Sequence, residues 1–348
     1  MFETIFKEFG INPDASVKPF GSGLINNTWL ISGNGNDLIL QRINHKVFKQ
    51  PFDISINISL ICDYLQANHP DYLFICPRKT ITGEEMIFIK EEGYFRLFPF
   101  IKNSHTTDAV AASSQAYEAA KQFGRFTNLL SGFPVEKLKI TLPDFHNLPL
   151  RYLQFESAIK EGNKERIKQS AAITSFLKNQ HEIVTISEQI DANTAFKKRV
   201  THHDSKINNV LFDENDKGLC VIDLDTVMPG YFISDFGDMM RTYLSLASEE
   251  EKDFSKIEIR DEYFKAIADG YLSEMGNEIS AVEKKYLVYA GKFMTYMQAL
   301  RFLTDHLNND TYYGSKYEGH NFIRANNQAT LLKKIIEKER SLQQLVGI

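Results

Sequence analysis

The first hundred residues alternate apolar and polar positions in short runs. Between residues 17 and 101, aliphatic, β-branched and aromatic residues form runs that glycine-containing turns separate, and this pattern predicts five short strands. A stretch at 53–67 interrupts them, with Ile54, Ile58, Ile61 and Leu65 spaced three and four apart. That spacing puts one apolar stripe on a helix. We therefore expect an antiparallel sheet that carries one helix.

Beyond residue 101 the apolar period becomes helical. Helices are expected at 109–130, 151–178, 234–246, 261–275, 281–307 and 326–345. One β-like insert, 209–212 and 219–224 around a turn at 215–218, predicts a hairpin. The chain is thus predicted to be α+β, with a β-rich part at 1–101 and an α-rich part at 102–348. The apolar stretch at 98–103 suggests a packed hinge between them.

Composition excludes several classes of protein. With 348 residues the chain is long enough for about two folding units and a large core. A net charge of −5 without a basic cluster argues against binding to nucleic acid or anionic membranes. No apolar run approaches the roughly 20 residues of a membrane span, and no signal peptide is readable. Cys62, Cys76 and Cys220 lack close spacing, so we expect buried thiols in a reducing compartment and a cytoplasmic protein.

The most informative residues lie at the two ends of the predicted hairpin. The segment THHDSKINN (201–209) contains H-x-D-x-K-x-x-N, with Asp204, Lys206 and Asn209. In phosphoryl transfer an aspartate accepts the acceptor's hydroxyl proton, a lysine neutralises phosphoryl charge and an asparagine oxygen binds a metal. The second strand ends at Asp223, which the hairpin should return beside Asn209. Amide and carboxylate oxygens suit Mg²⁺ that bridges ATP phosphates.

Two other polar motifs have simpler interpretations. A polar turn or a zinc site at His202 is disfavoured, because no second histidine or cysteine has ligand spacing. We expect His202 to brace the loop backbone rather than to act on substrate. The tripeptide D-F-G at 235–237 opens a predicted helix, and Asp235 is interpreted as a cap or loop brace, not as a metal ligand. No A-P-E follows, which argues against a protein kinase.

The β-rich part offers weaker signals for a nucleotide site. The turn around Gly21, Ser22 and Gly23 could place backbone N–H groups over phosphates. The third strand, where a kinase fold carries a phosphate-holding lysine, has Gln41 and Arg42. Phe98 and Phe100, at the hinge, are the candidates for stacking on adenine.

Segments 201–212 and 220–237 resemble the aminoglycoside phosphotransferase and choline kinase superfamily, which implies a bilobal protein-kinase-like fold. VIDLDTVMPG (221–230), with 201–209 and RFLTD (301–305), more closely resembles the N-acetylhexosamine 1-kinases. The likeness extends over about 18–321. It implies transfer of the ATP γ-phosphoryl to the anomeric hydroxyl of GlcNAc or GalNAc with Mg²⁺.

The resemblance also assigns roles to individual residues. Asp204 would be the base and would hold sugar hydroxyls, with Lys206 beside the phosphoryl group. Asn209 and Asp223 would bind the metal. The remaining matches concern the acceptor sugar, which would contact the positions of Leu24, Arg301 and Tyr312. Leu24 replaces a histidine of that family and Gln41 replaces the superfamily lysine, so sugar specificity and phosphate binding can differ, with Arg42 as a possible substitute cation.

Two rival functions stay open. A kinase for choline or an aminoglycoside could use a cage of aromatic residues at 296, 312, 313, 317 and 322, although Arg301 among them disfavours a cation. A non-catalytic nucleotide-binding protein is the other rival, against which Asp204, Asn209 and Asp223 argue. The preferred hexosamine, the nucleotide and the oligomeric state are not determined by the sequence.

Overall fold

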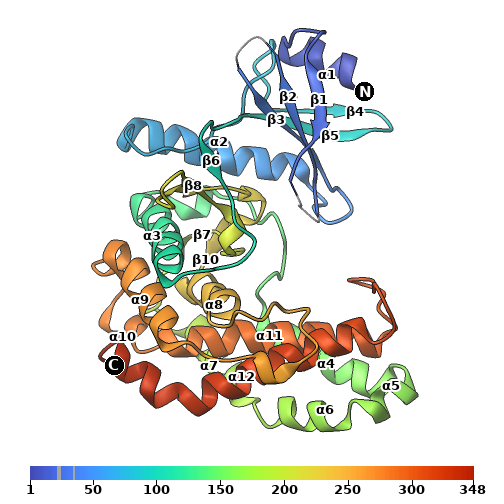
Figure 1. Ribbon diagram of the computed structural model, residues 1–348, viewed down its shortest axis with the longest axis vertical. Coiled ribbons are helices and arrows are strands. Elements are labelled where there is room, and N and C mark those ends of the chain that lie inside the picture. The colour runs from blue at the N-terminus through green and yellow to red at the C-terminus, as the bar shows by residue number, and fades with distance from the viewer. Residues whose placement is uncertain (22–24, 34–35) are drawn as a thin grey trace.

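The computed structural model describes residues 1–21, 25–33 and 36–348. A β-sheet forms one end of the molecule and a helical body forms the other, and the two chain termini lie at opposite ends (Figure 1). The α+β class expected from the sequence is confirmed. In the described residues, no helix combines the length and the apolar character that a membrane crossing needs.

The N-terminal sheet contains the five strands that the alternation predicts. Its antiparallel strands follow the order β1-β2-β3-β5-β4. Their bounds are Ser16–Pro19 (β1), Asn27–Ser32 (β2), Leu38–Ile43 (β3), Met86–Ile89 (β4) and Gly93–Pro99 (β5). Two helices accompany them, α1 at Phe2–Phe9 and α2 at Pro51–Asn68. The helix predicted at 53–67 therefore forms, with two more residues at its start and one more at its end.

The two faces of this sheet have different partners. Leu40 and Leu97 belong to a small core that also contains Phe6 of α1. Successive side chains of a strand point to opposite faces, so Gln41, Arg96 and Phe98 lie on the other face. Phe98 packs there against the main core, which continues through α2 into the helical body. One face of the sheet is thus closed by α1, and the other faces the helical body.

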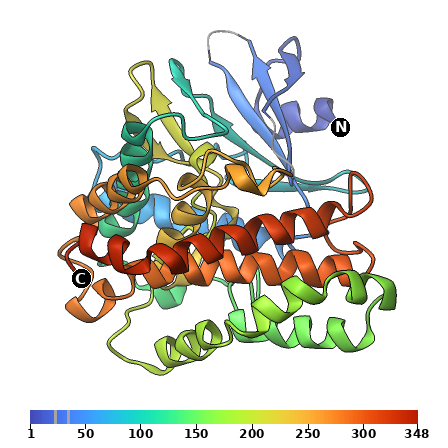
Figure 2. The same cartoon turned by 60° about the horizontal axis from the view of Figure 1, so that its bottom comes forward.

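The helical body is built around two long helices. Helices α11 (Leu287–Leu307) and α12 (His320–Leu345) run side by side (Figure 2). Helix α8 (Phe232–Tyr243) packs on α11. A Cβ at Gly237 would collide with the backbone oxygen of Ala290 on α11. The glycine of the D-F-G tripeptide therefore serves close helix packing. The pair α3 (Ser113–Leu129) and α9 (Asp261–Met275) forms a second contact layer.

Two predicted helices are interrupted in the structure. The stretch 151–178 forms α4 (Leu148–Glu161), α5 (Lys164–Gln169) and α6 (Ala171–Lys178). The first break falls at Gly162, and the side chain of Asn163 then accepts bonds from backbone N–H groups that begin α5. The stretch 281–307 divides into α10 (Ala281–Lys284) and α11, while α7 (Glu182–Ala192) was not predicted. Periodicity alone does not reveal such caps, because the apolar stripe continues across them.

The predicted hairpin is present and its second strand is shorter than expected. Strand β8 (Val210–Asp213) pairs with β9 (Gly218–Val221) on one side and with β6 (Ser104–His105) on the other, and β7 (Arg199–Thr201) pairs with β10 (Met228–Gly230). Short 3₁₀ turns occupy Val135–Lys137, Ile207–Asn209, Leu224–Thr226 and Phe254–Lys256. Strand β9 stops at Val221 because Asp223 adopts a left-handed conformation, with φ of 59°.

The expectation of three free thiols is wrong. Cys62 on α2 and Cys76 in the following loop form a disulfide, with Cα atoms 5.8 Å apart. Only Cys220 is a buried thiol. The bonded cysteines are 14 positions apart in the sequence, and it is the return of the loop along α2 that brings them together. The cysteines therefore do not support a reducing compartment.

Candidate active site

The loop between β7 and β8 places the predicted base in a fixed orientation. The Nδ2 of Asn209 donates to the Oδ2 of Asp204 at 2.9 Å and to its backbone oxygen at 2.8 Å. The Nζ of Lys206 lies 3.2 Å from the other carboxylate oxygen. Both Asp204 oxygens thus have a defined partner, and the side chain remains partly open to solvent. Such an arrangement holds a carboxylate ready to accept a proton.

The backbone of this loop is held from beneath by buried side chains. The two Asp235 oxygens accept from the backbone N–H groups of His202 and His203 at 2.9 and 2.7 Å. The hydroxyl of Thr226 donates to the backbone oxygen of His202, and that of Tyr243 to the oxygen of Ser205. Asp235 is therefore a brace for the loop, as the sequence suggested.

Backbone geometry also marks this loop as specialised. His203 has φ of 66°, in a left-handed region that costs energy for a residue with a side chain. Its ring lies against Gly230, where a Cβ would collide with the ring Nε2. His202 lies next to it, and its Nε2 is 2.9 Å from the backbone oxygen of Ile222. His202 thus links the loop to the end of the hairpin, the structural role expected for it.

The hairpin brings the two predicted metal ligands together. The register pairs Val210 with Val221, and the N–H of Ile222 donates to the backbone oxygen of Asn209 at 2.9 Å. The Asn209 amide nitrogen is turned toward Asp204, which leaves its Oδ1 for another partner. Among the described residues, no donor forms a hydrogen bond with the Asp223 carboxylate. Two hard oxygen donors are therefore available at one point, a set that fits Mg²⁺.

The electrostatics of Asp223 agree with a cation site. Its carboxylate is accessible to solvent but has dense protein around it. This partial desolvation, with the carboxylates of Asp225 and Asp204 nearby, raises the pKa of Asp223 to about 6. Arg96 acts in the opposite direction and lowers it. Clustered carboxylates repel one another, and a bound divalent cation would relieve that repulsion.

Lys206 interacts with carboxylates on two sides, Asp204 of the same loop and Asp238 of α8. Burial alone would lower the pKa of Lys206, but the carboxylates of Asp204 and Asp238 outweigh it, so the net shift is upward. Lys206 therefore stays charged at neutral pH. Asp204, Lys206, Asn209 and Asp223 are called the catalytic cluster below.

The predicted nucleotide residues do not all meet at this cluster. Gln41 pairs across the sheet with Arg96, and Phe98 lies under the Arg96 guanidinium at 5.0 Å. We call Gln41, Arg96 and Phe98 the sheet cluster. Arg42 follows Gln41 on the strand and so points to the opposite face, near Gly93. The structure does not bring Arg42 to the catalytic cluster.

The other predicted nucleotide residues that the structure describes, Phe100 and Gly21, lie outside both clusters. Phe100 stacks edge-to-face on Phe20 and lines a cavity of about 550 Å³. None of the described lining residues of that cavity belongs to the catalytic cluster. Gly21 has φ of 77°, a conformation suited to glycine. Ser22, Gly23 and Leu24 lie outside the described residues.

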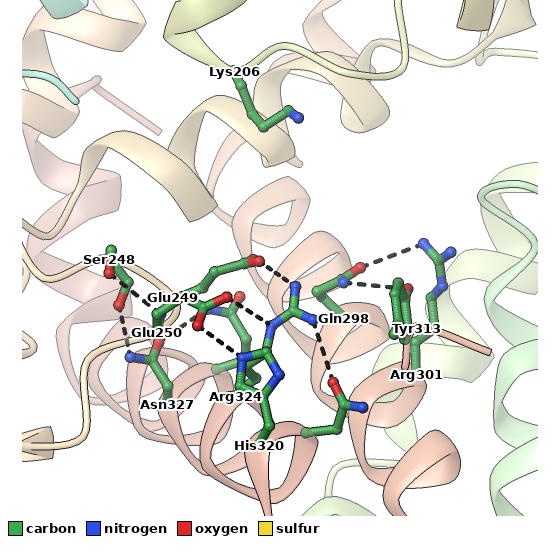
Figure 3. A network of polar contacts seen from close by, with 12 residues as sticks. Lys206, Ser248, Glu249, Glu250, Gln298, Arg301, Tyr313, His320, Arg324 and Asn327 are labelled. Carbon is green, nitrogen blue, oxygen red and sulfur yellow. Dashed lines mark hydrogen bonds and ion pairs between the residues drawn. The ribbon is translucent and has the colours of Figure 1, made fainter. Parts of the chain in front are cut away.

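The predicted acceptor residues stand on the helical side of Lys206. Arg301, on α11, lies between the rings of Phe145 and Tyr313, 5.6 and 5.5 Å from their centres. Its Nη1 donates a hydrogen bond to the Oε1 of Gln298 at 3.4 Å. In Figure 3, Lys206 stands above the network that contains Arg301, Gln298 and Tyr313. The exposed Tyr312 follows α11, and its backbone N–H donates to Asp305.

A chain of ion pairs borders the same network and was not predicted. Arg241 on α8 contacts Asp238 at 2.8 Å and Glu249 at 3.0 Å. Glu249 also pairs with Arg324 of α12. The charge of Lys206 is among those that lower the pKa of Glu249, after Arg241 and Arg324, which outweigh the effect of burial. We call Glu249, Gln298, Arg301, Tyr313 and Arg324 the acceptor-side cluster.

The contact that joins the sheet to the end of the hairpin was also not predicted. The Arg96 Nη2 contacts the buried Asp225, and the Nδ2 of Asn26 donates to the same carboxylate at 2.7 Å. Asp225 is the second acid of the D-x-D after β9, which was a visible signal. No feature of the sequence pointed to Arg96, because its partner depends on cross-strand register and on how the sheet packs on the helical body.

Comparisons with known proteins identify the family of this chain and structures with a similar fold. The family model described as the phosphotransferase enzyme family matches residues 16–276. Among solved structures, an aminopropanol kinase associated with a microcompartment is 15% identical, with 98% of this chain and 97% of that chain covered and a TM-score of 0.66. An amicoumacin kinase in complex with AMP-PNP and Ca²⁺ is 12% identical, with 96% and 92% covered and a TM-score of 0.65.

A choline kinase from Cryptosporidium parvum is 16% identical, covers 100% of this chain and 99% of its own, and has a TM-score of 0.60. These identities are low, so the three structures establish the fold and leave the acceptor open. The family match extends over about three quarters of the chain. It includes β7, the catalytic cluster and the brace Asp235. The chain therefore belongs to the phosphotransferase enzyme family.

Proposed function

We propose that this protein is an ATP- and Mg²⁺-dependent kinase that phosphorylates the anomeric C1 hydroxyl of an N-acetylhexosamine. The observation that carries the reaction type is the convergence of Asp204, Asn209 and Asp223 at the mouth of one hairpin. The acceptor class rests on two observations. Segments 221–230 and 301–305 resemble those of sugar 1-kinases, and Arg301 has no carboxylate partner among the described residues. The product is the sugar 1-phosphate, with ADP as the leaving group.

In the proposed reaction the sugar hydroxyl gives its proton to Asp204. Its oxygen then forms a bond to the γ-phosphorus as the bond from that phosphorus to the β-phosphate oxygen breaks. Asn209 and Lys206 fix the two carboxylate oxygens of Asp204, which limits the ways in which the acceptor hydroxyl can be held. Such positioning is a main source of rate in phosphoryl transfer.

Asn209 and Asp223 would hold Mg²⁺ through their free oxygens. Bound there, the metal supplies positive charge against the phosphate oxygens of ATP. The protein adds the charge of Lys206, whose raised pKa keeps it protonated beside Asp204. We assign Lys206 to the oxygens of the transferred phosphoryl group, where negative charge must be balanced.

The acceptor side favours a neutral, oxygen-rich molecule. Among the described residues, Arg301 forms no ion pair with a carboxylate. Its charge is felt nearby: burial lowers the pKa of Arg151, and the Arg301 guanidinium lowers it further. An unpaired guanidinium can donate to ring or N-acetyl oxygens. It repels a quaternary ammonium or an aminoglycoside. Tyr312 and the position of Leu24 would complete the sugar site.

The rival of a cationic acceptor meets a second difficulty. An aromatic cage needs rings that are free to face the ligand. Tyr296, one of its members, is fully buried in the core and donates to the backbone oxygen of Leu177. Of the other members, Tyr313 lies beside both Arg301 and Arg324, and Tyr317 lies beside Lys252, so these two rings already contact cations. The non-catalytic rival is disfavoured because the catalytic cluster is complete.

A panel of acceptors tests the proposal. ADP release is measured with GlcNAc, GalNAc, glucose, galactose, mannose and choline in the presence of ATP and Mg²⁺. We expect kcat/KM for an N-acetylhexosamine to exceed that for choline by at least about 100-fold, because a site built to donate hydrogen bonds to ring and N-acetyl oxygens rejects a molecule that lacks those oxygens. Choline should also fail to compete with GlcNAc. Faster turnover of choline than of every sugar would overturn the acceptor assignment.

A further inference from the structure

The nucleotide side of the site lacks its expected cation. In a kinase fold the third strand carries a lysine for the phosphates, and here that strand has Gln41. Arg42 points away from the catalytic cluster. The pairing of β3 with β5 sets Arg96 directly opposite Gln41, on the face toward the helical body. A cation therefore occupies the same place in space from a different strand.

The Arg96 side chain is immobilised by its neighbours. It is 2% exposed, and its Nε and Nη2 donate to the Oε1 of Gln41 at 3.0 and 2.8 Å. The Nη2 also contacts Asp225, and the guanidinium lies over the ring of Phe98. Gln41 thus supports the arginine as an acceptor. A glutamine is suited to this task, whereas a lysine there would repel the guanidinium.

One arm of the guanidinium has no partner. Among the described residues, Arg96 Nη1 is buried and forms no hydrogen bond. A buried N–H group without a partner is costly and rare in a folded protein. Arg96 contacts Asp225, which follows the proposed metal ligand Asp223 by two residues, so its guanidinium lies at the end of the same hairpin.

We propose that Arg96 is the residue that holds the α- and β-phosphates of the nucleotide, with Asp225 as the carboxylate that orients it. The pair takes the place of the usual lysine and its helix glutamate. A guanidinium can bind a carboxylate through one nitrogen and a phosphate oxygen through another, because its donors diverge in a plane. Nη1 is enclosed in this structure, so a nucleotide that binds it must displace the groups that cover it.

This inference rests on the proposed function only for ATP as the donor. It is tested by binding alone, without any acceptor, so a wrong sugar assignment leaves it intact. Isothermal titration of adenosine, ADP and ATP with Mg²⁺ separates phosphate contacts from adenine contacts. We expect wild-type protein to bind ADP more tightly than adenosine.

The decisive variant is Arg96→Lys, which keeps a cation beside Asp225 and removes the free arm. We expect its affinity for ADP and ATP to fall about tenfold, the worth of one charge-assisted hydrogen bond. Affinity for adenosine should stay unchanged, and Arg42→Lys should leave all three affinities unchanged. Arg96→Met should lose still more ADP affinity, but it leaves Asp225 buried without a partner and can lower stability.

Two outcomes would overturn the inference. Unchanged ADP affinity in Arg96→Lys would mean that Arg96 only joins the sheet to the helical body. Equal loss of adenosine and ADP would mean that the substitution disturbs the fold of the site. A selective loss of ADP and ATP, with an unchanged melting temperature, supports the phosphate contact, since a purely structural role would not distinguish these ligands.

Discussion

The catalytic cluster and the sheet cluster meet near Asp225 but are built in different ways. Three of the four members of the catalytic cluster fall within six consecutive residues, and a hairpin adds Asp223. Its loop is held by the carboxylate of Asp235 and by the hydroxyls of Thr226 and Tyr243. The sheet cluster joins residues 55 positions apart, and Asp225 connects it to the helical body.

The difference shows which functional side chains can be supplied from another position in the fold. A base and metal ligands must keep sub-ångström geometry, and a short loop with a strained residue such as His203 provides it. A phosphate-binding cation must direct its charge and a free N–H group at the phosphates, and more than one strand of the sheet can hold such a side chain. Neighbouring strands can therefore supply it from either β3 or β5.

The largest effect is expected at the base. Asp204→Asn removes the proton acceptor and keeps the hydrogen bond from Asn209, so kcat should fall about a thousandfold while both KM values change little. Steady-state kinetics measure this. The control is Asp216→Asn, an exposed carboxylate on the turn of the same hairpin. Near-normal turnover of Asp204→Asn would show that the base is elsewhere.

The acceptor-side cluster should separate binding from chemistry. Arg301→Met removes an unpaired guanidinium, so KM for the sugar should rise roughly 30-fold while KM for ATP is unchanged. The exposed Arg340 on α12 gives the matched control, Arg340→Met. An unchanged sugar KM in Arg301→Met would place the acceptor away from α11.

Bracing of the loop should matter less than the base itself. Asp235→Asn leaves one backbone N–H of His202 or His203 facing an amide nitrogen, and stability should fall by about 2 kcal/mol. Displacement of Asp204 should lower kcat about tenfold. Thermal unfolding and kinetics are measured together, with the surface variant Asp269→Asn as control. Full activity in Asp235→Asn would mean that the loop holds its shape without this brace.

The smallest effect on catalysis is expected from the disulfide, which lies in the N-terminal part but outside the sheet cluster. Replacing Cys62 and Cys76 with serine should lower the free energy of unfolding by about 3 kcal/mol, from the loop that the bond closes. kcat should change by less than about twofold, because no catalytic contact is removed. Denaturant unfolding with and without reductant gives the comparison. A large drop in kcat with unchanged stability would connect this loop to the site.

Local patterns were sufficient for much of the fold and of the catalytic cluster. Alternation predicts the five strands, and the apolar stripe predicts α2 and α9, because burial of one face decides both. The hairpin register then places Asp223 beside Asn209. The return of the loop to Cys62 could not be predicted, nor could the meeting of Arg96 with Asp225 or of Glu249 with Arg324. Those contacts depend on how separate elements pack together.

In the proposed reaction the anomeric oxygen of the sugar receives the phosphoryl group. Proton-coupled phosphorus NMR of the protein with ATP, Mg²⁺ and GlcNAc or GalNAc identifies the acceptor atom directly. We expect a new phosphate signal that is split by the anomeric proton and collapses when that proton is decoupled. A phosphate signal coupled to protons on any other carbon, or no transfer to either sugar while ATP still binds, would contradict the proposed function.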